Sequence, residues 1–141
     1  MKLLNKYPMI KLDNGLNVVN YSSPHPYTFD TGEVLPMCTK EVSSTTMLKE
    51  DHEVIDSSIR GIAVKDVFIN FSLQPFMTHE LVKLSLMSAV DIILVPYPVL
   101  NALKKGISGS WPKIRTCRTT DRFTKVISST QFCAYKKKEN D

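Results

Sequence analysis

The stretch from Gly61 to Leu73 constrains the fold most, because it is the clearest strand pattern in the chain. Apolar side chains recur there at every second residue, which places them on one face of an extended strand. They are Val67, Ile69, Phe71 and Leu73. Pro75 follows at once and cannot continue a strand ladder, so the strand is expected to end there.

Helical patterns alternate with strand patterns after this point. A helix is predicted over about 76–90, with Thr78 as its N-cap and Glu80 in its first turn. Residues 91–95 form a short segment with mostly apolar and β-branched side chains, which is typical of a buried strand. A second helix is predicted over about 98–105, and its start offers backbone N–H groups to an anion.

Hairpin signals surround this region. A strand pattern covers 16–21, and the alternation over 27–35 is interrupted by an Asp-x-Gly turn at Asp30 to Gly32. Further strands are predicted over 113–119 and 123–135. We therefore predict an α+β fold, with an antiparallel β-sheet core and two short helices, in a single domain with flexible ends at about 1–8 and 136–141.

Length and charge narrow the classes of function. The chain has 141 residues, enough for one core, and a formal net charge of +4. That mild basicity suits a small anionic ligand and does not require a polyanion. No apolar run is long enough for a membrane span. Three cysteines without CxxC spacing argue against a disulfide framework or a zinc site, and favour the cytoplasm.

Arginine is concentrated near the C-terminus. Three of the four arginines are Arg115, Arg118 and Arg122, and guanidinium groups bind phosphate through two parallel hydrogen bonds. On a flat strand Arg115 and Arg118 face opposite ways. A turn at 119–121 would return Arg122 beside Arg118, with Asp121 orienting one guanidinium. The alternative is a solvated basic face.

Other side chains could complete such a site. His25 lies between two prolines, which stiffen its loop. Phe123 and Lys125 share a face if this piece is extended, and Tyr97 and Phe76 are further aromatics that could stack on a base. Aromatic side chains of this kind are more often core residues than stacking platforms, and a core role is the alternative for each.

Catalytic patterns are missing from the sequence. No nucleophile elbow, zinc-binding helix motif or Gly-rich phosphate loop occurs. Cys117 would have a depressed pKa if Arg115 and Arg118 lay beside it, but an inward strand residue is the alternative. Glu50 to Glu53 resembles a metal site only superficially and is predicted to be a solvated turn. A nucleic-acid-binding module and an enzyme that cleaves cyclic nucleotides both remain open.

Three sequence blocks together resemble a family of small phage proteins. They are Ser23-Pro24-His25-Pro26-Tyr27-Thr28-Phe29 with Asp30-x-Gly32-x-Val34-Leu35-Pro36, Asp91-Ile92-Ile93-Leu94-Val95-Pro96-x-Pro98, and Arg115-x-x-Arg118-x-x-Asp121-Arg122-Phe123-Thr124-Lys125 with Phe132-Cys133. The blocks cover about a third of the chain. In this respect the chain is similar to the first described family of Thoeris anti-defence proteins.

The resemblance implies a function without catalysis. Members sequester, without cleaving it, the cyclic ADP-ribose isomer that an immune TIR enzyme makes, and some capture cyclic oligonucleotides. It implies no cofactor or metal, a homo-oligomer of at least two chains, and action in the cytoplasm of the infected bacterium. Arg118 and Arg122 would take the phosphates and His25 with an aromatic the ribose and base, and Arg115 is a weaker match.

Overall fold

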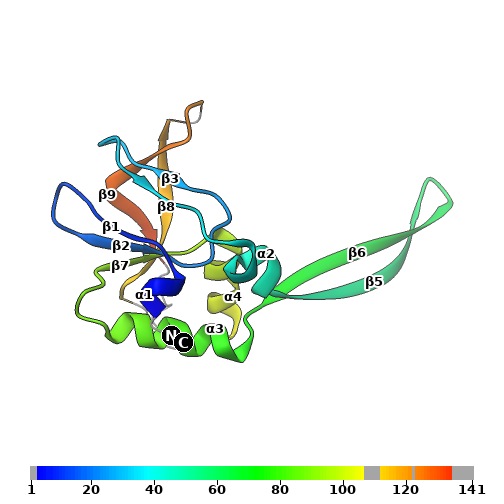
Figure 1. The fold of residues 1–141 in the computed structure, drawn as a ribbon. Coiled ribbons are helices and arrows are strands. Elements are labelled where there is room, and N and C mark those ends of the chain that lie inside the picture. Colours follow the sequence, from blue (N-terminus) through cyan, green and yellow to red (C-terminus); the bar gives the residue numbers. More distant parts are fainter. Residues whose placement is uncertain (1–2, 107–111, 122, 135–141) are drawn as a thin grey trace, which may run out of the picture.

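A five-stranded sheet forms the core of the molecule. The computed structural model describes residues 3–106, 112–121 and 123–134. The strand order is β1–β2–β7–β8–β9 (Figure 1). These strands are β1 (Met9–Lys11), β2 (Asn17–Asn20), β7 (Ile92–Leu94), β8 (Ile114–Asp121) and β9 (Val126–Ala134).

The centre of this sheet is parallel. β7 runs parallel to β2, with Ile93 opposite Val19, and parallel to β8, with Leu94 opposite Arg115. β1 and β9 join antiparallel at the two edges. The α+β class is confirmed, but the predicted antiparallel core is wrong at its centre. Parallel neighbours need long crossovers, and local hairpin signals do not reveal which strands such crossovers connect.

Two helices follow the predicted order but differ in their limits. α3 spans Pro75–Leu86, with Gln74 as N-cap, so the predicted N-cap at Thr78 and end near 90 are wrong. Proline is well placed in a first helical turn because its missing N–H has no helical partner there. α4 spans Tyr97–Gly106, close to its prediction. The described residues also include the 3-10 turn η1 (Lys40–Val42) and the short helix α2 (Ser44–Met47).

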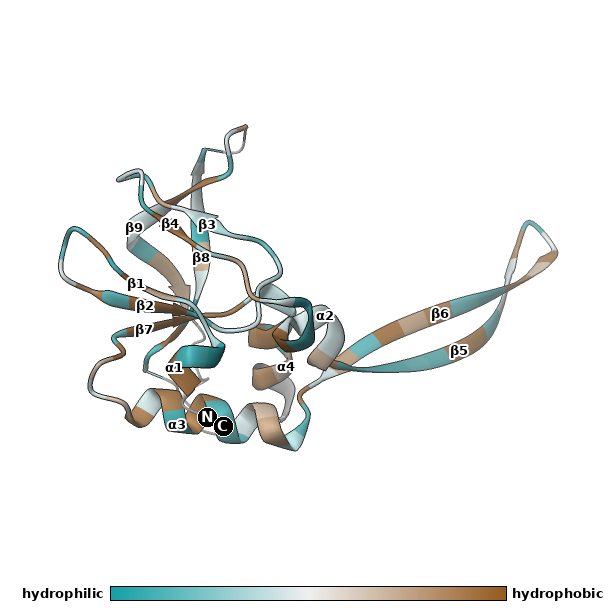
Figure 2. Cartoon of the chain, viewed as in Figure 1, coloured by the Kyte–Doolittle hydropathy of each residue, from teal (hydrophilic) through white to brown (hydrophobic). Residues whose placement is uncertain are grey.

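The sheet is covered on both faces. One face, with Val19, Ile93 and Ile114, packs against buried side chains of α3 and α4. The other, with Val18 and Leu94, packs against the hairpin of β3 (Tyr27–Thr28) and β4 (Val34–Leu35). The predicted Asp-x-Gly hairpin is thus confirmed and forms a third layer (Figure 2).

The start of the chain is packed rather than loose. α1 (Leu3–Lys6) leads to Tyr7, which is buried against Tyr21 with ring centroids 4.6 Å apart. The predicted flexible end over 1–8 thus includes a short helix and a buried tyrosine from Leu3 onward. The end over 136–141 lies outside the described residues. No helix of the described chain is both long and apolar enough to cross a bilayer.

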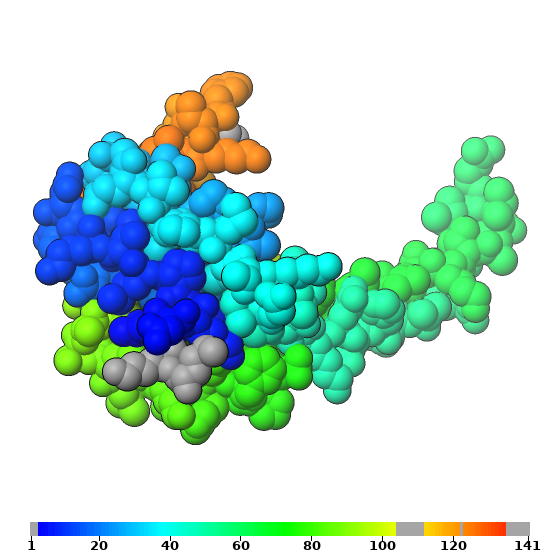
Figure 3. All heavy atoms as spheres, in the orientation of Figure 1, coloured from blue at the N-terminus to red at the C-terminus, as the bar shows by residue number. Residues whose placement is uncertain are grey.

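A long hairpin projects from this core. β5 (Lys49–Ile59) and β6 (Ile62–Ser72) pair antiparallel over 11 residues each, with Glu50 opposite Phe71 and Ile59 opposite Ile62. We call residues 49–72 the arm. Figure 1 and Figure 3 show it extending away from the sheet and helices. The predicted strand at 61–73 is confirmed, but Glu50 to Glu53 belongs to β5 rather than to a turn.

Candidate functional site at the carboxyl edge of the parallel strands

Three neighbouring parallel strands deliver their following segments to one edge of the sheet. Asn20, Leu94 and Arg115 occupy one level of β2, β7 and β8. Beyond this level the chain continues to His25 after β2, to Tyr97 after β7, and along β8 to Arg118. All three of these residues are exposed. The carboxyl edge of parallel strands is the usual ligand-binding edge of such sheets.

The loop that carries His25 is braced by short polar contacts. The Asn20 amide donates to the Pro36 carbonyl (2.8 Å), while its oxygen accepts the Ser23 N–H (3.0 Å). The Ser23 hydroxyl donates to the His25 carbonyl (2.8 Å) and accepts the His25 N–H (3.1 Å). The imidazole is therefore presented to solvent from a fixed backbone. Sequence reasoning credited the prolines and missed Asn20 and Ser23, although an Asn followed three residues later by Ser is a local turn signal.

Ser22 is an unusual member of this loop. Its φ is 76°, in the left-handed region that costs a non-glycine residue about 1–3 kcal/mol. It is fully buried, and its hydroxyl has no hydrogen-bond partner among the described residues. A buried hydroxyl without a partner is itself unfavourable. Both costs fall at the carboxyl edge, where strain often marks functional positions.

The first turn of α4 offers less to an anion than predicted. The Pro96 carbonyl accepts the N–H groups of both Val99 (3.0 Å) and Leu100 (3.2 Å). Pro98 has no N–H to offer. Only the Tyr97 amide is left for a ligand in this turn, so side chains would have to supply most phosphate contacts at this edge.

The arginine strand differs from the predicted flat strand. The β8–β9 pairing shifts register between Cys117 and Thr119 and again between Thr119 and Asp121. Arg115 is half-buried, and its Nη1 donates to the Ile114 carbonyl (2.9 Å). Arg118 is exposed, and Arg122 lies outside the described residues, so the predicted pair of Arg118 with Arg122 is not described.

The residues from Asp121 to Lys125 form a turn. The Asp121 carboxylate accepts the Phe123 N–H (2.9 Å), and hydrogen bonds from Phe123 and Thr124 lower its pKa. Asp121 thus fixes the turn rather than a guanidinium among the described residues. Lys125 has φ 58°, so the piece is not extended and the predicted shared face of Phe123 and Lys125 is wrong. Phe123 is 98% exposed.

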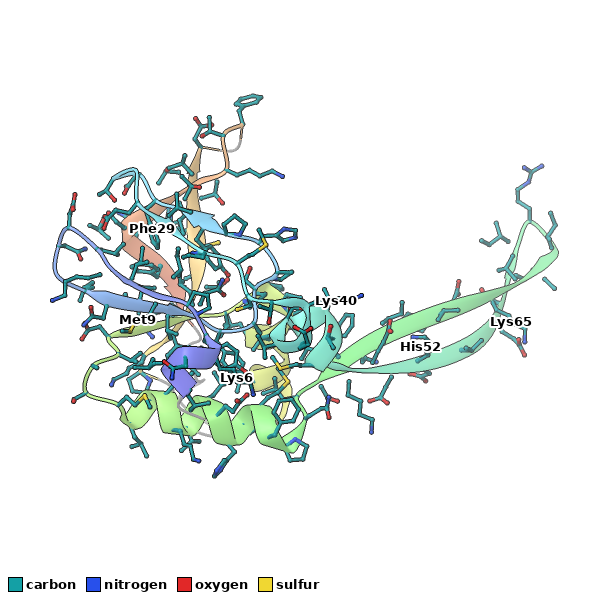
Figure 4. All side chains as sticks on the ribbon, viewed as in Figure 1. Lys6, Met9, Phe29, Lys40, His52 and Lys65 are labelled. Carbon is teal, nitrogen blue, oxygen red and sulfur yellow. The ribbon has the colours of Figure 1, made fainter. Side chains whose placement is uncertain are left out.

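Phe76 lies at a different place. Its ring is 5.8 Å from Lys6 Nζ, and Lys6 pairs with Glu80 at 2.7 Å. Glu80 is buried and also accepts the hydroxyls of Tyr7 (2.7 Å) and Tyr21 (3.0 Å). Figure 4 marks Lys6 beside α3. Phe76 therefore belongs to this polar cluster on the helical side. The sequence analysis missed the cluster because it placed Glu80 in the first turn of the helix and gave it no buried partners.

Thiols at the edge are not activated. Burial raises the pKa of both Cys38 and Cys117, so the predicted depression of the Cys117 pKa by arginine is wrong. Cys117 instead packs against the β3–β4 side of the core, as the alternative held. Burial also raises the pKa of Tyr27 to about 12. These two thiols and this phenol therefore stay protonated at neutral pH.

No cluster of metal-ligating side chains occurs in the part of the chain that the structure describes. His52 Nε2 lies 3.2 Å from Glu50 Oε1, but both side chains are about half exposed on the arm. An imidazole, a phenol and a guanidinium therefore lie beyond the same level of three neighbouring strands. Comparison of the chain with protein-family models, curated proteins and solved structures gives no match.

Proposed function

We propose that the protein binds a cyclic ADP-ribose isomer at the carboxyl edge and withholds it from a host immune effector without cleaving it. The observation that carries the proposal is the register of three adjacent parallel strands, beyond whose shared level lie His25 after β2, Tyr97 after β7 and Arg118 within β8. An imidazole, an aromatic ring and a guanidinium suit ribose, base and phosphate respectively.

The chemistry of the edge favours binding over reaction. Raised thiol pKa values at Cys38 and Cys117 leave no activated sulfur there. The sequence blocks that resemble Thoeris anti-defence proteins include His25, Arg118 and the prolines on either side of Tyr97. In this proposal the protein acts as a homo-oligomer in the cytoplasm of an infected bacterium.

Retention and recovery test the function. The full chain is incubated with cyclic ADP-ribose isomers, separated from free ligand, denatured, and the released material analysed by mass. Intact ligand is the expected result. A cleaved product would instead identify an enzyme, and no retention would overturn ligand binding. Retention of single-stranded nucleic acid that falls steeply with salt would identify the nucleic-acid alternative.

The arginines provide the sharper variant. Arg118→Ala with Arg122→Ala should weaken ligand binding by about 100-fold or more, because two charge-assisted contacts of about 1.5–3 kcal/mol each are lost. Arg60→Ala is the matched control, since Arg60 is the fourth arginine and lies at the turn of the arm. Calorimetric titration gives both affinities. Equal binding by the double variant and the parent would refute the phosphate contact.

A further inference from the structure

The arm is largely uncovered by the described residues, although α4 contacts β6. Large apolar side chains on it are 41–65% exposed. They are Val54, Ile55, Ile59, Ile62, Val67, Phe68, Ile69 and Phe71. A two-stranded hairpin is at best marginally stable alone, and its free edges invite pairing. Such an arm needs a partner surface.

The register assigns these side chains to two faces. Directly paired residues of an antiparallel ladder share a face. One face carries Val54 with Val67, and His52 with Ile69. The opposite face carries Glu53 with Phe68, and Ile59 with Ile62. Apolar surface therefore continues along both sides, most densely over β6, as Figure 2 shows.

The exposed apolar area of the two faces together approaches the share of one partner in a stable interface. Eight half-exposed side chains of this size leave roughly 700 Å² of apolar surface, divided between the two faces. A standard interface buries about 800 Å² per partner. Two arms that are buried reciprocally would supply the area of a complete dimer interface.

The charge of the arm differs from that of the rest of the chain, and this difference favours a second copy as the partner. The arm carries five acidic and three basic side chains, whereas the rest of the chain carries nine acidic and 15 basic ones. The acidic arm thus complements the basic remainder of another copy. Figure 4 shows Lys65 farther out along the arm than His52. Lys65 Nζ lies 3.4 Å from Asp56 Oδ1, so this exposed lysine is paired within the arm.

The outer face of α3 offers a fitting surface. Val82 is 40% exposed and Leu86 is 81% exposed, one turn apart on that face. The basic residue Lys83 and His79 are exposed beside them. Apolar side chains bordered by these groups match the apolar, acidic arm.

We propose that two copies of this chain exchange arms, each arm packing on the outer face of α3 in the other copy. The inference deepens the homo-oligomeric part of the proposed function and does not depend on the ligand. Its tests measure mass and capture, so its failure is distinguishable from a failure of ligand retention.

Mass in solution is the first test. Sedimentation of the full chain at tens of micromolar should give about twice the chain mass of 16.0 kDa. Val67→Lys with Ile69→Lys should shift this to a single chain. The matched control is Val34→Lys with Met37→Lys, which adds the same charge at side chains 50% and 55% exposed outside the arm, and should remain dimeric. A parent of single-chain mass would overturn the proposal without any variant.

Capture distinguishes exchange onto the core from pairing between arms. A chain in which Asn-Gly replaces residues 52–69 should have single-chain mass and an unchanged circular-dichroism melt. Tagged full chain should still capture this shortened chain, because one arm and one α3 face suffice. Failure of capture, or capture that survives Val82→Glu with Leu86→Glu in the shortened chain, would overturn the assignment to α3. If the shortened chain does not fold, the same two substitutions in the full chain should abolish the dimer, and their failure to do so would overturn it.

Discussion

The core sheet and the arm are built from the same element but bury their side chains to opposite degrees. Ile93 in β7 is fully buried, whereas Ile62 in β6 is 65% exposed. The central strands β2 and β7 are short and have a layer on each face. The arm strands have 11 residues each, and their large apolar side chains stay about half exposed. Backbone pairing satisfies hydrogen bonds in both regions, but only a second layer removes apolar surface from water.

The largest expected contrast comes from one substitution made in both regions. Ile93→Ala should lower the free energy of unfolding by about 2–5 kcal/mol, because it leaves a cavity between packed layers. Ile62→Ala should leave the stability of the core unchanged within about 0.5 kcal/mol. Urea unfolding at several protein concentrations measures both effects. Ile62→Ala should lower only the extra stability that appears as protein concentration rises. Equal losses of unfolding free energy in the two variants at every protein concentration would contradict this difference between core and arm.

High pH should weaken the core alone. Burial raises the pKa values of Tyr7, Tyr21 and Tyr27, and the arm contains no tyrosine. A tyrosine with a raised pKa on folding holds its proton more tightly when folded. Its stabilisation is therefore complete below about pH 10, the unfolded pKa, and falls as pH rises further.

As pH rises from 10 to 11, each of these tyrosines should lower the free energy of unfolding by about 1 kcal/mol. Denaturant unfolding at the two pH values measures the total loss. Tyr7→Phe with Tyr21→Phe should remove about two thirds of it, which separates the tyrosines from titrating lysines. An unchanged pH dependence in that variant would contradict the burial of their hydroxyls around Glu80.

The smallest expected effect concerns strained backbone in the two regions. Ser22 at φ 76° and Arg60 at φ 54° both adopt the left-handed conformation. Ser22→Gly should raise the stability of the core by about 0.5–1 kcal/mol, because it relieves strain and removes a buried hydroxyl without a described partner. Arg60→Gly should leave core unfolding unchanged. Thermal melts of both variants test this, and a loss from Ser22→Gly would show that its hydroxyl makes a stabilising contact.

Local patterns predicted most elements but not their arrangement. The buried strand at β7, the hairpin at 27–35 and helix α4 follow from periodicity and turn residues, because those signals act within a few residues. The parallel pairing of β2, β7 and β8 depends on crossovers, which no local pattern encodes. Period two at Val67 and Ile69 predicted a strand correctly, yet it could not show that both side chains remain about half exposed.

The candidate site was predicted in parts for the same reason. His25, Tyr97 and Arg118 were named from their residue types, and the register places their segments at one edge. The sequence could not show that Phe76 lies away from these residues, because its position beside Lys6 depends on the packing of α1 against α3. The register shifts around Thr119 likewise changed the geometry expected for the arginine stretch.

Hydrogen exchange as a function of protein concentration tests the central contrast most directly. Amides of the core strands β2 and β7 should be protected to the same extent at nanomolar and at tens of micromolar concentration. Amides over 52–69 of the arm should exchange rapidly in dilute protein and become protected as concentration rises, because a second copy covers them. Arm protection that is equal at all concentrations would contradict the account.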